Sequence, residues 1–169
     1  MKRLNVLLLG LLVSFAGLSQ QNAADKFFEK YAGKEGFTTV NLNGNLLKFV
    51  ANLDKENEVD PVLMKIETVK ILSAEDETIS PNFYNEIMKN FPQKDYEELL
   101  TVKESDQQVK ILINEKNGVI KELLLVVGGD DDNALIIIKG SIPLKDLSHL
   151  SKSLNMDELE VLKDVDVDF

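Results

Sequence analysis

Hydrophobic residues recur with helical spacing in four parts of the chain. The first stripe consists of Ala24, Phe27, Phe28 and Tyr31 at positions i, i+3, i+4 and i+7, which together form one apolar face of a helix. Similar stripes predict further helices in three segments: 46–53, 80–91 and 144–154. We therefore expect three or four amphipathic helices.

Six shorter segments have the composition of β-strands. Their β-branched and other apolar residues cover 38–42, 64–72, 99–103, 109–113, 119–127 and 134–139. Asn117-Gly118 predicts a tight hairpin between two of them, because a type I′ turn needs two positive φ angles. The continuous apolar runs Leu123–Val127 and Leu135–Ile138 are typical of central strands.

Turns are expected at three glycine-containing sites: Asn43-Gly44, Gly128–Asn133 and Gly140-Ser141. The last of them leads into a helix with Pro143 near its start. Strands grouped in meanders, with helices before and after, are typical of the α+β class. We expect an antiparallel sheet of five to six strands with three to four helices packed on one face.

The first nineteen residues have the pattern of a cleavable secretory signal. Lys2 and Arg3 precede the apolar run Val6–Phe15, and small and polar residues follow it. The run, about ten residues long, is too short to span a ~30 Å hydrocarbon core as a helix, although a retained membrane anchor is the alternative. With cleavage after Ser19, we expect export to the periplasm or the medium and no membrane span in the mature chain.

Residues 20–169 have the length of a single α+β domain, with an acidic tail at 157–169. The whole chain has a net charge of −10, and loss of the two signal cations makes the mature domain more acidic. This charge disfavours nucleic acid and anionic lipid as partners and is compatible with cationic partners or calcium. The chain has no cysteine, so we expect neither a disulfide nor a lipid anchor.

Three aspartates, Asp130, Asp131 and Asp132, follow two glycines in one of the expected turns. They offer the hard oxygen ligands that calcium prefers, although their spacing is not that of an EF-hand. Aspartate also favours turns simply because its side chain bonds the nearby backbone. These residues are weak calcium candidates, and no other metal or cofactor site is expected.

Asp164, Asp166 and Asp168 alternate with apolar residues in the acidic tail. In a strand these carboxylates share one face, where they bind a partner or protect an exposed edge by repulsion. We take them as interaction candidates. The only histidine, His149, lies off the apolar stripe of the last helix, so we expect it to be exposed and without a catalytic role.

A family resemblance extends from Phe27 to Leu154. It is carried by the stretches FFEKYAGKEGFTTVNLNGNLLKF and YEELLTVKESDQQVKILINEKNGVIKELLLVVGGDDDNALIIIKGSIPLKDLSHLSKSL, and above all by the block Leu123–Leu147. These stretches resemble DUF4252, an exported domain of unknown function found mostly in Bacteroidetes-type bacteria. The resemblance implies a small envelope protein, often a lipoprotein, and no activity. The missing cysteine favours a soluble periplasmic or secreted form.

No catalytic constellation emerges from these residues, so we expect an exported envelope protein that is not an enzyme. The leading hypothesis is a binding or interaction module whose partner is another envelope protein. A calcium-dependent surface protein and a hydrolase of unrecognised type are the alternatives. The hydrolase predicts a concave pocket with at least two convergent carboxylates of perturbed pKa.

Overall fold

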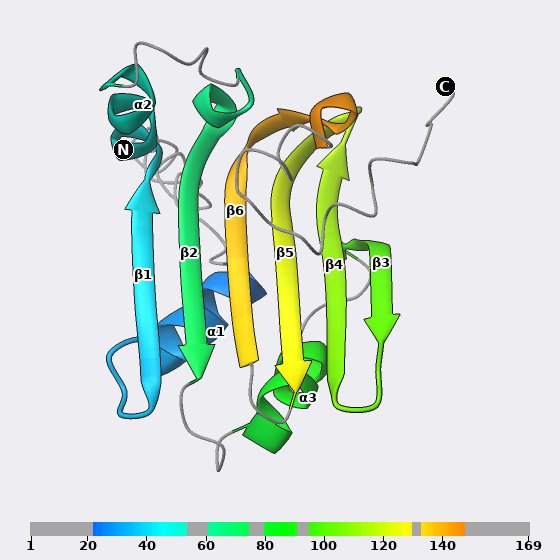
Figure 1. The fold of residues 1–169 in the computed structure, drawn as a ribbon. Helices are drawn as coiled ribbons and strands as arrows, with labels where there is room; N and C mark the ends of the chain where they lie inside the picture. The colour runs from blue at the N-terminus through cyan, green and yellow to red at the C-terminus, as the bar shows by residue number, and fades with distance from the viewer. Residues whose placement is uncertain (1–21, 54–60, 75–79, 91–94, 130–132, 148–169) are drawn as a thin grey trace, which may run out of the picture.

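Six antiparallel strands form one sheet in the computed structural model, which describes residues 22–53, 61–74, 80–90, 95–129 and 133–147 (Figure 1). The strand order is β1-β2-β6-β5-β4-β3. The strands are β1 (Phe37–Asn43), β2 (Ile66–Ala74), β3 (Glu97–Lys103), β4 (Gln107–Lys116), β5 (Val119–Gly129) and β6 (Asn133–Pro143). The helices are α1 (Ala23–Tyr31), α2 (Gly44–Leu53) and α3 (Ser80–Asn90), with 3-10 turns η1 (Leu63–Lys65) and η3 (Leu144–Asp146). The expected α+β class is confirmed.

The hairpin between β4 and β5 forms where the sequence predicts it. Asn117 and Gly118 have φ angles of 55° and 75°, the left-handed pair that a type I′ turn requires. The apolar run Leu123–Val127 is buried along its whole length, because β5 lies between β4 and β6 and has an apolar layer on each face. The prediction of a central strand is therefore confirmed.

Helices α1 and α3 cover one face of the sheet, which we call the helix face (Figure 1). Phe27 of α1 and Phe83 of α3 meet edge to face, with ring centroids 5.6 Å apart. Beneath them lie the inward side chains of four strands, including Leu72, Leu124 and Ile137. The two helices are therefore held by an apolar core that reaches from β2 to β4.

The opposite face of the sheet is also apolar and buried, with Ile111, Leu123 and Ile138 all at 0% exposure. At one end it packs against Leu47 of α2 and Leu147. No helix among the described residues runs along this face. Only α1 and α3 contribute to the core of the helix face, so the structure does not place three to four helices there.

The predicted turn at Gly140-Ser141 is wrong, because β6 continues through both residues to Pro143. Ile142 is fully buried and pairs with Ile120 of β5. A Cβ atom on Gly140 would collide with the backbone carbonyl oxygen of Lys65. The glycine is therefore needed for a close approach of two chain segments. Of the expected last helix, residues 148–154 lie outside the described part of the chain.

The predicted turn at Asn43-Gly44 is instead the start of α2, which follows β1 without a loop. The Asn45 N–H donates a hydrogen bond to Asn43 Oδ1 (2.8 Å), as in a helix N-cap.

Among the described residues, no helix has the length and apolar character needed to cross a membrane.

Candidate functional site

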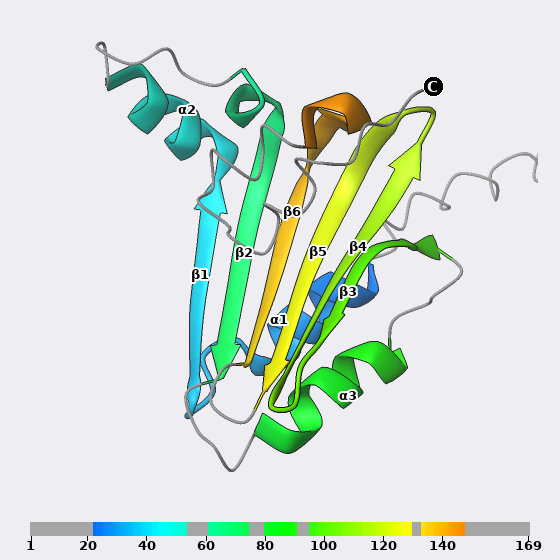
Figure 2. The ribbon, with the colours of Figure 1, turned by 45° about the vertical axis from the view of Figure 1, so that its right-hand side comes forward.

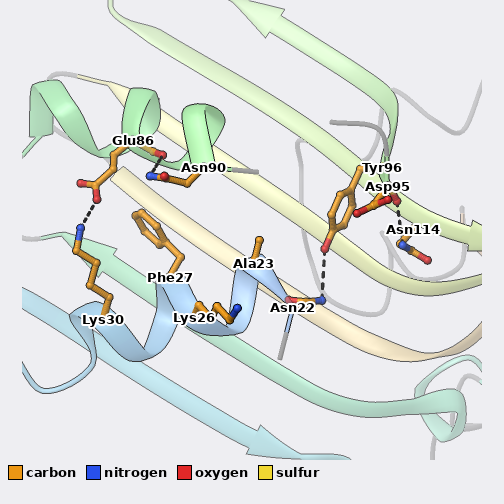
Figure 3. Close-up of a pocket in the computed structure, with 10 residues that line it drawn as sticks. All are labelled: Asn22, Ala23, Lys26, Phe27, Lys30, Glu86, Asn90, Asp95, Tyr96 and Asn114. Atoms are coloured by element: carbon orange, nitrogen blue, oxygen red, sulfur yellow. Dashed lines mark hydrogen bonds and ion pairs between the residues drawn. The ribbon is translucent and has the colours of Figure 1, made fainter. Parts of the chain in front are cut away.

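A groove of about 720 Å3 opens between α1 and α3 and reaches the start of β3 (Figure 3). Polar side chains line its walls from α1 and its N-cap, from α3, from the segment just before β3 and from β4: Asn22, Lys26, Lys30, Glu86, Asn90, Asp95, Tyr96 and Asn114. The amphipathic pattern of each helix explains this arrangement, since the apolar stripes face the sheet and leave polar flanks along the gap.

A buried carboxylate lies behind the inner wall of this groove. Glu122 of β5 is 4% exposed, and its Oε2 accepts hydrogen bonds from the Tyr96 hydroxyl (2.5 Å) and from Asn22 Nδ2. Its Oε1 lies 3.5 Å from Lys139 Nζ, and accepts no hydrogen bond from the described residues. Two wall residues are therefore positioned by one charge in the sheet.

A second carboxylate, Asp25, connects α1 to the same row of charges. Its Oδ1 lies 2.9 Å from Lys70 Nζ, and its Oδ2 pairs with Lys139. Lys139 and Glu122 are directly opposite each other on β6 and β5, and the Asp25 N–H donates to Asn22 Oδ1 (3.1 Å). The first turn of α1 thus contacts β2 and β6 through Asp25, and its N-cap Asn22 contacts β5 through Glu122. These contacts hold the inner wall of the groove in place.

The pKa shifts of two carboxyl groups and one phenol beside the groove favour their ordinary charge at neutral pH. Burial alone would raise the pKa of Asp25, but its contacts with Lys139 and Lys70 outweigh burial, and the pKa is lowered. Hydrogen bonds from Lys30 and Tyr31 lower the pKa of Glu86. Burial and the neighbouring Glu122 raise the pKa of Tyr96, so this phenol stays protonated and acts as a donor.

Four polar groups of the groove are left for a ligand. The Lys26 ammonium and the Asp95 carboxylate make no hydrogen bond or ion pair with the described residues, and the Oδ1 atoms of Asn90 and Asn114 accept none. The amide groups of these two asparagines are oriented by donation to the carbonyls of Glu86 (2.8 Å) and Asp95 (2.9 Å). A cation, an anion and two fixed acceptors therefore line one open space.

The structure does not test the candidates that were named from the sequence. Asp130, Asp131 and Asp132, the tail residues Asp164, Asp166 and Asp168, and His149 all lie outside the described residues. The described parts of the chain hold no group of three or more acidic or histidine side chains suited to a metal ion. Asn133, the last residue of the expected turn at 128–133, donates a hydrogen bond from its Nδ2 to the Gly129 carbonyl oxygen (2.7 Å).

Sequence reasoning missed the partly buried charge row of Asp25, Lys70, Glu122 and Lys139. A signal was present, because Glu122 and Lys139 stand beside continuous apolar runs at positions that face inward. A charge at such a position is rare unless it is paired. Which charges meet, however, depends on strand register, and the sequence pattern alone does not specify it.

Comparison with known proteins identifies one family. The profile described as "Domain of unknown function (DUF4252)" matches residues 31–150, which include every strand and most of the charge row. No curated protein and no solved structure is significantly similar to the chain.

Proposed function

The chain belongs to the DUF4252 family of domains of unknown function, and on that premise we propose that it is a non-enzymatic binding module of the bacterial envelope. Its ligand is a polypeptide segment of another envelope protein, held in the groove between α1 and α3. The observation that carries this proposal is the set of four unengaged polar groups in the groove, two of them oriented by hydrogen bonds.

These groups match the chemistry of a peptide chain. The two free Oδ1 acceptors, on Asn90 and Asn114, suit the N–H groups of an extended backbone. Lys26 and Asp95 add one charge of each sign, which favours a segment with charges of both signs and gives orientation. A volume of about 720 Å3 lies within the range of ligand sites, roughly 300–1,000 Å3.

The directions in which the carboxyl pKa values are shifted favour binding over catalysis. A general acid that works near neutral pH needs a carboxyl whose pKa is raised. The pKa values of Asp25 and Glu86 are lowered by lysine partners, so both remain ionised and paired. The hydrolase alternative needs two convergent carboxylates, at least one of which has a raised pKa.

Export is supported by the first nineteen residues, whose charged, apolar and small-residue segments follow the order of a secretory signal. Expression of the full chain in a bacterial host, followed by fractionation and N-terminal sequencing, tests this part. We expect a mature chain that begins at Gln20 and is absent from the cytoplasm. A cytoplasmic chain that retains Met1 would contradict it.

The groove is tested by cross-linked pull-down of the tagged chain from its native envelope. We compare wild type with Lys26→Glu and with the control Lys103→Glu, an identical charge change at an exposed residue of β3 that does not line the groove. We expect a reproducible protein partner whose recovery falls about tenfold, equivalent to ~1.4 kcal/mol, only with Lys26→Glu. Equal recovery with both variants, or no partner with wild type, would refute the groove as the binding site.

A further inference from the structure

The sheet has two edges, and β1 forms one of them. It pairs with β2 along all seven residues, from Phe37 opposite Ala74 to Asn43 opposite Thr68. Figure 1 shows β1 as the outermost strand, and no described strand lies beyond it. Edge strands present backbone N–H and C=O groups that can pair with another chain.

The two edges differ in the protection that their sequences provide. Strand β3, at the far edge, carries Glu97, Glu98 and Lys103 and has a register irregularity between Glu98 and Leu100. Charges and bulges of this kind are the usual means of preventing edge-to-edge pairing. The sequence of β1, FTTVNLN, has no charge and no proline, and its pairing with β2 has no irregularity, although 28% of the chain is charged.

We propose that β1 pairs antiparallel with β1 of a second copy of this chain, so that two six-stranded sheets become one continuous sheet across a two-fold axis. In such a pair residue i of one copy faces residue j of the other and residue j faces residue i, so a side chain on the axis meets its own kind. Like charges opposite each other are destabilising, so an uncharged strand is a condition for this arrangement. Strand β1 meets that condition within a chain whose net charge is −10.

An exposed apolar surface lies at the same edge of the sheet. The large hydrophobic residues exposed in the described parts of the chain are Leu46 (49%), Phe49 (60%) and Met64 (42%). The first two belong to α2, which directly follows β1 and projects past the end of the sheet (Figure 2), and Met64 belongs to the adjacent η1. Leu46 begins the apolar stripe from which the helix over 46–53 was predicted, so its exposure is consistent with a surface that a second copy covers.

The first test is the mass of the purified chain in solution over a series of concentrations. We compare wild type with Asn41→Lys, which adds a charge at an exposed position of β1, and with Gln108→Lys, which makes an equivalent change at an exposed position of β4. We expect a dimer for wild type and for Gln108→Lys, and at least a tenfold higher dissociation constant for Asn41→Lys. Circular dichroism of each variant verifies that the fold is retained.

Higher ionic strength should strengthen the wild-type dimer, because salt screens the repulsion between two acidic copies. A wild-type chain that stays monomeric over the whole concentration series would overturn the proposal. A dimer that Asn41→Lys and Gln108→Lys weaken equally would also overturn it, since the interface would then lie elsewhere.

Cysteine cross-linking provides a second measurement, made simple because the chain has no cysteine of its own. Single substitutions of Thr39, Val40 and Asn41 scan the centre of β1. Directly opposite residues of an antiparallel pair have Cα atoms ~4.5–5.5 Å apart, which is within disulfide reach. We expect a covalent dimer at one or two of these positions and none for Gln108→Cys. Cross-linking at none of the three would exclude the β1–β1 pairing.

Discussion

Gly128 of β5 lies against α3 so closely that even one methyl group should be harmful. A Cβ atom built on Gly128 would be 2.8 Å from Cγ of Tyr84 and 2.9 Å from its Cδ2, and closer still to its Cβ. Carbon atoms in contact prefer ~3.5–4.0 Å. Because the Cβ of Tyr84 is attached directly to the helix backbone, rotation of the ring cannot remove the collision.

The substitution Gly128→Ala must therefore displace α3, whose Phe83 and Ile87 are 2% and 0% exposed. Overpacking of a core typically costs about 1–3 kcal/mol, and we expect about 3 kcal/mol because a whole helix has to move. Urea unfolding followed by circular dichroism measures this loss of free energy of unfolding.

Two companion variants identify the atom responsible. Tyr84→Ala removes the ring but keeps the Cβ atom, so Gly128→Ala should remain destabilising in that background. Tyr84→Gly removes both, so Gly128→Ala should then be nearly neutral, as a double-mutant cycle would show. A cost of Gly128→Ala below about 0.5 kcal/mol in the wild type, or an undiminished cost beside Tyr84→Gly, would refute this reasoning.

Three further predictions concern the charge row, β6 and the hairpin. The folded pKa of Asp25 lies below its unfolded value because its lysine partners outweigh burial, so its stabilisation is present above about pH 4 and is lost as the pH falls further. The gap in free energy of unfolding between wild type and Asp25→Asn should therefore narrow below about pH 4, and a constant gap would contradict the ion pairs. Gly140→Ala places a Cβ against a backbone carbonyl and should cost about 3 kcal/mol in urea unfolding; a change below about 1 kcal/mol would exclude that close approach. Gly118→Val puts a β-branched residue at φ 75° and should lower the unfolding free energy by about 1–2 kcal/mol, whereas Asn117→Gly should be tolerated; similar losses in both variants would argue against the turn type.

The strands and the β4–β5 hairpin were predictable because their signals are local. Asn117-Gly118 specifies its turn through the φ angles of two adjacent residues. The apolar run in β5 reflects burial on both faces of a central strand. The same local reasoning failed at Gly140, which was interpreted as a turn residue. Its real constraint comes from Lys65, a residue far away in the sequence.

The groove was not predictable from the sequence, because its walls come from two helices, one strand and the segment before β3, which have no common motif. Asn22, Asn90 and Asn114 are unremarkable polar residues in their own segments. They become a site because α1 and α3 pack side by side on the same face of the sheet. That placement depends on contacts such as Phe27 against Phe83, which join segments that are distant in the sequence.

By itself the sequence determined the number and type of most elements, the α+β class and the family, because periodicity and turn chemistry depend on neighbours within a few residues. Only the tertiary structure decided the strand order, the uncharged β1 edge and the meeting of Glu122, Lys139 and Asp25. Pairing between distant strands is set by the sum of many long-range contacts, and a slip of one residue would turn every side chain of a strand to the other face. Because the local pattern does not carry that information, the site becomes visible only when the sheet is assembled.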